Sequence, residues 1–447
     1  MGGAAATLFL FAFAIRVRGI ESHFWLLGDQ IFAWEIALRP FHELPLVGGA
    51  THVGGYTIGP AYHWIMWAIR VTVGPWFDNL PHAGGYGQAA IESAADALLF
   101  VAAWHRVETP WVALAASLVI VTAGFDVAVS AIDWSPPIAS ALGKMAVALT
   151  LLNWHQAATW RVAVVAGLAW CAWQAHTGAV YVTASVMIAL VVDPLLRRDW
   201  PALRSVALAI AAVVLVLQLP YLAHRVLDRS SGPAMGAVTG GVWQILTGTA
   251  RPEVAKSVAG YAAAFNFIEV EPWHTALPLW TLAACGAVVA VRYRRDPGVL
   301  ALVLLPQVLA IVGYALFLGA LDHYYYVPVM PAAVLTIAFA AGVPARTRTA
   351  HAVGIALLVS AVAIVPGRLT FAATMFRLPE YRVLVSASRE IVARHRAVRA
   401  IRTEFTLPPS TDPEFLYKTL GGRIDPSASH SALIRADGSV RYVEGGL

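Results

Sequence analysis

The chain has 447 residues, of which 59% are hydrophobic and only 13% are charged, and its formal net charge is +5. A soluble domain carries roughly 25% charged residues, so this sequence has too few charges to cover a water-exposed surface. The composition therefore excludes a soluble enzyme and a disordered protein, and it indicates an all-α polytopic membrane protein. Cys171 and Cys285 lie in apolar runs, so neither a disulfide framework nor a cysteine metal site is expected.

Apolar runs that approach the ~20 residues of a membrane-spanning helix occur at eleven places. They are residues 3–17, 88–104, 109–125, 137–152, 161–174, 176–193, 202–220, 273–291, 298–320, 327–343 and 349–366. The region from 161 to 193 is divided into two spans because Gln174, His176 and Gly178 interrupt it. The first run lacks the basic leading segment of a signal peptide, so we expect a retained anchor.

Connections that contain arginine alternate with connections that contain no basic residue. Arginines occur at 106, 161, 197–204, 292–295 and 346–348, whereas 126–136, 174–177 and 321–326 contain neither Lys nor Arg. Basic loops face the cytoplasm, so the alternation predicts a plasma-membrane protein with a cytoplasmic N-terminus and an extracytoplasmic C-terminus. Because the positive charge follows the topology, we expect a membrane-lipid environment and no nucleic-acid partner.

This topology predicts a transmembrane domain over 1–366 and an extracytoplasmic tail or module over 367–447. Two long outer loops, 18–87 and 221–272, belong to the transmembrane domain. Within the first loop, the stretches from Asp29 to Leu38 and from Tyr62 to Val73 are amphipathic at helical spacing. Such segments are typical of helices that lie in the membrane interface.

Unusual polar side chains fall mostly on the predicted outer side of the membrane. They are Asp29, Glu92, Asp96, Asp126, Asp133, Lys144, His176, His224, Arg225, Asp322 and His323, followed by Tyr324. Charged groups at membrane depth are costly and are usually functional. Their position at one face predicts a polar site there, whereas transporters bind their substrates near the midplane.

Four segments, taken in order, carry a family resemblance. They are Gly28-Asp29-Gln30; Gly54 to Tyr62; Trp134 to Pro137 together with Gln174 to Thr177; and Asp322 to Ala332. In these segments the chain resembles the polyprenyl-phosphate-sugar-dependent glycosyltransferases of the GT-C fold. The resemblance lies in the bacterial branch of the protein mannosyltransferase and lipid A aminoarabinose transferase superfamily, and it covers roughly residues 1–366.

The resemblance implies transfer of a hexosyl or pentosyl group from a polyprenyl-phosphate carrier to an extracytoplasmic acceptor. That acceptor is a lipid-linked glycan, a cell-envelope polysaccharide or a protein. It implies Asp29 as the general base, since a hydroxyl nucleophile must lose its proton. Lys144, His224 and Arg225 are the candidates for the donor phosphate, because the leaving group is an anion. The expected site-lining residues are Glu92, Asp96, Asp133, His176, Asp322, His323 and Tyr324.

No cofactor is expected and no metal ligands are predicted, because the sequence contains no compact ligand motif. The family often has Asp-Glu where this chain has Asp29-Gln30. That departure leaves the participation of a second carboxylate or a divalent metal open.

Each candidate residue also has a structural interpretation. Asp29 suits the N-cap of the helix that follows it, and Glu92, Asp96 and Lys144 suit an internal ion pair that orients helices. His176 suits an interhelical hydrogen bond, Arg225 a contact with lipid headgroups, and the segment from His323 the aromatic belt. Two other protein classes remain open: a lipid-carrier flippase or transporter, and a polysaccharide polymerase or ligase.

Overall fold

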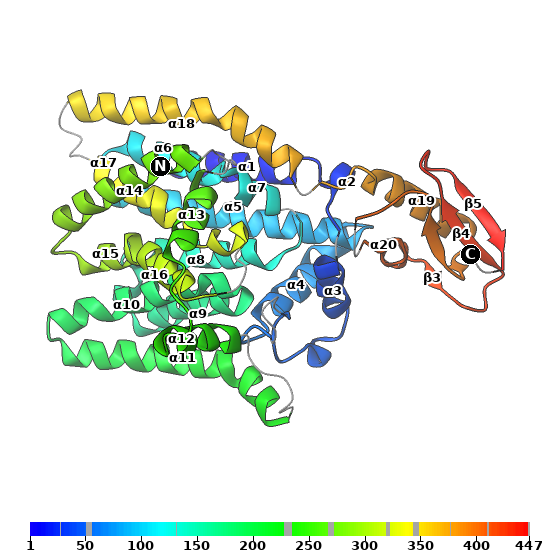
Figure 1. Ribbon diagram of the computed structural model, residues 1–447, viewed down its shortest axis with the longest axis horizontal. Coiled ribbons are helices and arrows are strands. Elements are labelled where there is room, and N and C mark those ends of the chain that lie inside the picture. Colours follow the sequence, from blue (N-terminus) through cyan, green and yellow to red (C-terminus); the bar gives the residue numbers. More distant parts are fainter. Residues whose placement is uncertain are drawn as a thin grey trace.

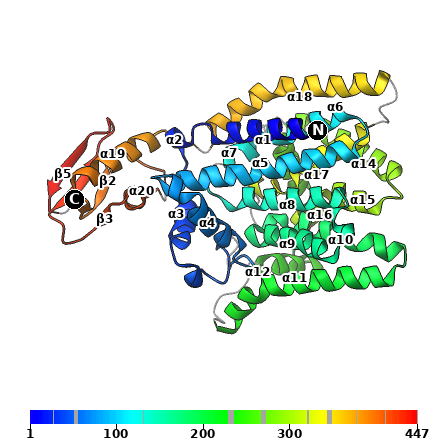
Figure 2. The same cartoon turned by 180° about the vertical axis from the view of Figure 1, so that it is seen from behind.

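A computed structural model describes residues 1–26, 28–50, 56–130, 132–227, 235–266, 272–318, 322–342, 348–375, 377–408 and 411–445. Long helices run alongside one another in a bundle, and a small module of helices and strands lies beyond one end of it (Figure 1). Seen from behind, α5 crosses the length of the bundle between α1 and α8 (Figure 2).

The bundle helices follow the predicted apolar runs in chain order. They are α1 (Gly2–Val17), α5 (Leu80–Arg106), α6 (Pro110–Val121), α7 (Gly124–Val129), α8 (Ser135–Leu151), α9 (Thr159–Ala175), α10 (Val180–Leu196), α11 (Trp200–Leu227), α14 (Pro272–Arg292), α15 (Pro297–Val303), α16 (Leu305–Ala315), α17 (Met330–Ala341) and α18 (Arg348–Thr374). Each of the eleven predicted runs coincides with one of these helices or, for 298–320, with the pair α15 and α16.

The number of membrane spans is a separate matter. Four helical stretches in the described residues are long and apolar enough to cross a membrane: Gly2–Ser22, Thr177–Leu196, Trp200–Leu227 and Arg348–Thr374. Counting the bent pair α15 and α16 as one span gives five. The helices of the bundle thus indicate a membrane protein, whereas the predicted count of eleven spans is not confirmed. Several of the remaining helices, such as α6 and α17, are apolar but short.

Proline and capping residues explain where several helices begin and bend. Pro110 and Pro136 occupy the first turns of α6 and α8, where a missing backbone N–H costs nothing. Asp296 caps α15 by accepting a hydrogen bond from the Val299 amide at 3.1 Å. The 45° bend between α15 and α16 falls just before Pro306, which cannot continue the helical hydrogen-bond ladder.

The two predicted amphipathic segments form α3 (Gly28–Ala37) and α4 (Ala61–Thr72), and the short α2 (Ile20–His23) precedes them. All three lie at the end of the bundle that carries the C-terminal module (Figure 1). The predicted second outer loop contains two helices that were not expected, α12 (Met235–Leu246) and α13 (Val254–Asn266). In α13, Ser257 donates a hydrogen bond to the Ile311 carbonyl at 2.8 Å, so this part of the loop packs on the bundle.

The C-terminal module begins after α18, which continues beyond residue 366 to Thr374. It contains α19 (Tyr381–Arg394), α20 (Pro413–Thr419) and five short strands. β1 (Ala397–Val398) pairs in parallel with β3 (Arg423–Ile424). β2 (Ile401–Thr403) pairs in parallel with β4 (His430–Ile434), which pairs antiparallel with β5 (Val440–Glu444).

The module is attached to the N-terminal end of α5 by polar contacts. The hydroxyl of Tyr381 accepts a hydrogen bond from Asn79 at 3.0 Å and lies 2.9 Å from the ring Nε2 of His82. Arg389 of α19 pairs with Asp78 at 2.7 Å. Tyr381, Asn79 and His82 are all buried. Breaking the contacts among them would leave buried polar groups without hydrogen-bond partners, and the free-energy cost of doing so holds the module in place.

Candidate functional site

A cavity of about 270 Å³ lies at the end of the bundle that carries α3 and α4. Its walls come from segments far apart in the sequence. They include Asp29, Phe32, Thr57, Tyr62, His63, Trp134, Ser135, Ala175, His176, Thr177, Tyr324 and Tyr325. Of the five connections that we placed on the outer side, four therefore contribute to one cavity: 18–87, 126–136, 174–177 and 321–326. The fifth, 221–272, supplies none of its lining residues.

Several arginine-containing connections gather elsewhere. Arg106 pairs with Asp296 at 3.7 Å, and Arg292 pairs with Glu108 at 3.5 Å, although these residues belong to connections far apart in the chain. Arg197 and Arg295 line a second cavity together with Arg106. The arginine pattern thus separates two sets of loops that the fold also keeps apart.

Asp29 lies in the first turn of α3, with its side chain exposed toward the cavity. Tyr62 of α4 lines the same cavity. Burial together with the charges of Asp133 and Asp29 holds the pKa of the Tyr62 phenol well above its usual value. In the part of the chain that the structure describes, no residue donates a hydrogen bond to the Asp29 carboxylate. This carboxylate can therefore accept a proton from an incoming hydroxyl without first breaking a structural contact.

Asp133 is buried directly behind the cavity wall, in a left-handed backbone conformation with φ 52°. One carboxylate oxygen accepts a hydrogen bond from Trp34 Nε1 at 2.7 Å, and its backbone carbonyl accepts one from the Tyr62 hydroxyl at 2.8 Å. Gly84 permits this arrangement, because a Cβ there would lie 2.3 Å from the carboxylate. Burial raises the pKa of Asp133 well above its usual value, although the Trp34 bond opposes that shift. Asp133 thus joins α3 to α4 rather than facing the cavity.

His176 and the tyrosines form an aromatic wall. The His176 ring lies 5.7 Å from Tyr324 and 5.2 Å from Tyr325, and Tyr324 lies 4.7 Å from Trp134, all between ring centroids. Nδ1 of His176 accepts a hydrogen bond from the Gly178 amide at 3.1 Å, which places the ring proton on Nε2. Burial lowers the pKa of His176 to about 3, so the ring is a neutral donor at neutral pH.

Gln174 connects this wall to the segment that opens α4. Its Nε2 donates to the Leu217 carbonyl of α11 at 2.8 Å, and Gln218 in turn donates to the Ile58 carbonyl at 2.8 Å. Gly59 allows the close approach, since a Cβ there would lie 2.3 Å from the Gln174 amide. The glycine and glutamine of two resemblance segments thus meet in space.

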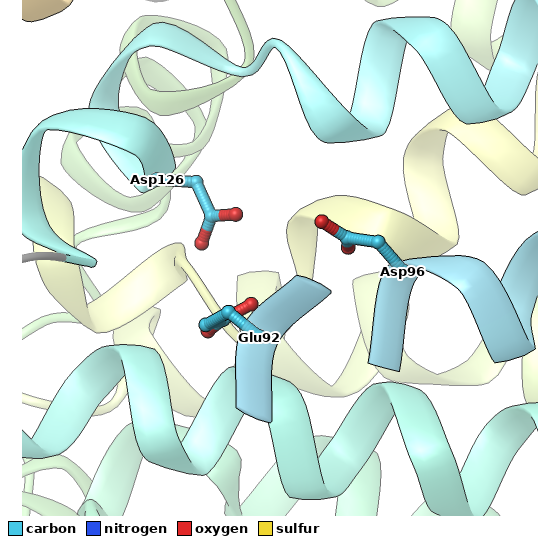
Figure 3. Close-up of side chains that lie close together, drawn as sticks. All are labelled: Glu92, Asp96 and Asp126. Carbon is cyan, nitrogen blue, oxygen red and sulfur yellow. The ribbon is translucent and has the colours of Figure 1, made fainter. Parts of the chain in front are cut away.

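Glu92, Asp96 and Lys144 do not line this cavity. They lie inside the bundle in a buried charge cluster with Arg16 of α1 and Asp126 of α7. Figure 3 shows the three carboxylates converging on one space. Lys144 Nζ lies 2.8 Å from Glu92, 2.9 Å from Asp96 and 3.1 Å from Asp126. Arg16 Nη2 lies 2.7 Å from Asp96 and 3.0 Å from Asp126.

Three carboxylates at this separation are a candidate metal site by geometry alone. The cluster already contains two cations, however, because an ammonium and a guanidinium lie between the carboxylate oxygens. Those cations supply the charge that a metal would bring, so we interpret the cluster as an ion-pair network that joins α1, α5, α7 and α8. Arg16 and Asp126 were not predicted as members of the network. Arg16 lies in α1 and Asp126 in α7, and the sequence does not show that these helices pack beside α5 and α8.

Two of the remaining candidates, His224 and Asp322, lie near residues at the cavity. The His224 ring, at the end of α11, lies 6.4 Å from Tyr56, next to Thr57 of the cavity wall, and Arg225 follows it in the chain. Asp322 is exposed and lies near Tyr324, whose pKa is raised by burial, by Tyr325 and by Asp322. The side chain of His323 lies outside the described residues, as do Gly54 and Gly55 of the second resemblance segment.

Thr57 and His63 also line the cavity, although neither was predicted as a site residue. Thr57 belongs to the second resemblance segment. His63 was noted only as part of an amphipathic helix. The signal available in the sequence was the position of His63 directly after Tyr62, the last residue of the second resemblance segment.

An apolar helix bundle with several helices long enough to cross a membrane defines the general class as a membrane protein, and this one has a cavity at one end of the bundle. Comparison with known family models gave no match, and comparison with curated protein sequences gave none either. The fold is similar to that of ArnT from Cupriavidus metallidurans bound to undecaprenyl phosphate, with 14% identity and a TM-score of 0.55 over 95% of this chain and 86% of that one. The apo ArnT structure matches with 15% identity and a TM-score of 0.49 over 96% and 92% of the two chains.

ArnT is a GT-C polyprenyl-phosphate-sugar glycosyltransferase. The resemblance found in the sequence is therefore confirmed at the level of the fold, and it extends beyond residue 366 to about 95% of the chain.

Proposed function

We propose that the protein is a membrane glycosyltransferase that moves one hexosyl or pentosyl group from a polyprenyl phosphate to an extracytoplasmic acceptor. The observation that carries this proposal is the cavity containing Asp29 at one end of an ArnT-like fold. The ArnT structure contains undecaprenyl phosphate, which supports a carrier of the same chemical class for this chain. The acceptor would be a lipid-linked glycan, a cell-envelope polysaccharide or a protein.

In the proposed reaction, the acceptor hydroxyl attacks the anomeric carbon while Asp29 accepts the hydroxyl proton. The new bond joins the acceptor oxygen to the anomeric carbon, and the bond from that carbon to the phosphate oxygen breaks. Its electron pair leaves with the prenyl phosphate. Direct displacement requires the base and the leaving phosphate on opposite faces of the sugar, and it inverts the anomeric configuration.

The leaving phosphate needs hydrogen-bond donors or cations. The Nε2–H of His176 is one donor on the cavity wall, and His224, whose ring lies 6.4 Å from Tyr56, and the adjacent Arg225 are further candidates. Lys144 is a weaker candidate for this role than the sequence indicated, because three carboxylates already surround its ammonium. No metal-dependent step is needed, and we expect chelation to be tolerated.

The donor test compares two sugar sources with purified protein and an acceptor extract. We expect transfer from a synthetic prenyl-phosphate sugar and none from the corresponding nucleotide sugar, because a lipid carrier presents its phosphate at the interface. Radiolabelled product is measured with and without a chelator. Transfer from the nucleotide sugar alone would refute the lipid donor, whereas loss of activity on chelation would refute only the metal-independent reaction.

The proposed orientation places the cavity outside the plasma membrane, with a cytoplasmic N-terminus. A reporter that is active only outside the cytoplasm should be active when fused after residue 447 and silent when fused near residue 200. The reason is that the arginines of residues 197–204 belong to a connection expected to face the cytoplasm. The reverse pattern would place the Asp29 cavity in the cytoplasm and would remove the argument for a lipid donor.

A flippase or transporter is the first alternative. The features that favoured it were Lys144 and the break between the runs 161–174 and 176–193. In the structure Lys144 belongs to the ion-pair network, and the break forms part of the cavity wall. A polymerase or ligase remains the second alternative, and product size in the donor assay distinguishes it, since a single transfer adds one sugar.

A further inference from the structure

Two polar side chains on the cavity wall have no hydrogen-bond partner within the described part of the chain. Both ring nitrogens of His63 are buried and unpaired, and the residue is only 2% exposed. The hydroxyl of Thr57 is likewise buried and unpaired, with the residue 8% exposed. Buried polar atoms nearly always have a hydrogen-bond partner. Three atoms without one at a single small cavity indicate that a polar ligand supplies their hydrogen bonds.

The surrounding structure holds His63 in place. Tyr62, the preceding residue on α4, is fixed by its hydrogen bond to the Asp133 carbonyl, and its ring lies 6.0 Å from the His63 ring. Phe32 of α3 packs edge-on against the other side at 6.5 Å. Aromatic contacts from α3 and α4 therefore orient the His63 ring, and within the described residues both of its buried nitrogens lack a hydrogen-bond partner.

Thr57 is held in a similar way, by backbone bonds. Its amide donates to the Gly49 carbonyl at 3.1 Å, and its carbonyl accepts from the Gly48 amide at 3.2 Å. A Cβ on residue 48 would overlap the Thr57 hydroxyl, so glycine is needed there for the observed packing. The backbone around Thr57 thus fixes the position of this hydroxyl.

The chemistry of these groups favours a neutral, hydroxyl-rich partner. Burial, together with the charge of Arg39, lowers the pKa of His63 to about 4, so its imidazole is neutral at neutral pH. A neutral imidazole has one donor and one acceptor, and a threonine hydroxyl has both functions. Sugar hydroxyls also donate and accept, whereas a phosphate only accepts and favours cations. Trp134, Tyr324 and Tyr325 supply aromatic surface in the same cavity, against which the apolar face of a sugar ring can pack.

We infer that His63 and Thr57 hydrogen-bond the hydroxyl groups of the transferred sugar and select which sugar the enzyme accepts. This inference rests on the proposed function, since it assigns one wall of that cavity to the sugar part of the donor. The phosphate and the prenyl chain would be held elsewhere. His63 and Thr57 are thus specificity-determining residues, distinct from Asp29, which accepts the proton.

The test measures binding of two lipids to purified protein. One is the prenyl-phosphate sugar that the wild type binds most tightly from a panel of hexoses and pentoses, and the other is the same prenyl phosphate without sugar. We expect His63→Phe and Thr57→Val each to weaken binding of the sugar-bearing lipid about 10-fold and to change binding of the sugar-free lipid by about 2-fold or less, since each removes hydrogen bonds to the sugar alone.

Two matched variants control for nonspecific effects. His42→Phe changes an exposed histidine in the same outer segment, and Thr72→Val changes an exposed threonine at the end of α4. Both should bind the two lipids as the wild type does. Without ligand, His63→Phe should unfold at the same temperature as the wild type or higher, because it removes two unpaired buried nitrogens; a structural histidine would give a lower temperature.

The outcomes separate the two proposals. Wild-type-like binding of the sugar-bearing lipid by both His63→Phe and Thr57→Val would overturn the inference and leave the proposed function intact. An equal loss of binding affinity for both lipids would also overturn the inference, because His63 and Thr57 would then contact the prenyl phosphate and not the sugar. If the wild type binds neither lipid, the proposed function fails and the inference fails with it.

Discussion

Replacing Asp29 by asparagine is expected to lower the transfer rate about 100- to 10,000-fold, the usual contribution of a general base. Asparagine keeps the shape of the side chain but cannot accept the proton of the acceptor hydroxyl. The folded state should change little, because Asp29 is exposed and an acidic side chain in the first turn of a helix contributes only about 0.3–1 kcal/mol. The measurements are single-turnover transfer from the prenyl-phosphate sugar and thermal unfolding of the same preparations.

The control for this prediction is Glu43→Gln, which neutralises an exposed carboxylate in the same outer segment. It should leave the transfer rate unchanged. If Asp29→Asn keeps about a third of the wild-type rate or more, the residue is not the general base, whose loss costs far more. Asp29 would then be only an acidic residue in the first turn of α3, where a negative charge is favourable near the helix N-terminus.

The second large effect is expected at Lys144. Changing Lys144 to methionine leaves Glu92, Asp96 and Asp126 buried beside a single cation, Arg16. Removing one partner of a buried ion pair typically destabilises a protein by about 3–5 kcal/mol, because the opposite charge remains buried without compensation. We therefore expect a clear fall in the unfolding temperature and in the yield of folded protein.

A second variant tests whether charge compensation is the cause. Combining Lys144→Met with Glu92→Gln removes one carboxylate together with the ammonium, so part of the lost stability should return. If Lys144 instead binds the donor phosphate, Lys144→Met would keep the wild-type unfolding temperature and lose binding of the sugar-free prenyl phosphate. These two results cannot both occur, so the role of Lys144 is decided by one pair of measurements.

The sequence was sufficient to predict which connections share a side of the molecule. Arginine-free connections and the segment after the first span were placed together because the positive charges avoid them, and Asp29, His176 and Tyr324 do line one cavity. The apolar runs also predicted where the bundle helices lie, since hydrophobicity is read along the chain without knowledge of distant contacts. The number of membrane spans could not be predicted from hydrophobicity alone, because helices such as α6 and α17 are apolar but short.

Long-range packing decided the rest. Glu92 and Asp96 could be placed on one helix face from their spacing, but only the packing of four helices brings Arg16 and Asp126 to them. In the same way, Thr57 and His63 are ordinary polar residues in the sequence and become unpaired cavity atoms only when α3, α4 and the outer loops close around them. Composition thus determined the membrane class, and the charge pattern indicated which connections lie together, because both follow from the local sequence. The tertiary structure determined which charges neutralise one another and which polar groups are left for a ligand, because those depend on contacts between residues far apart in the chain.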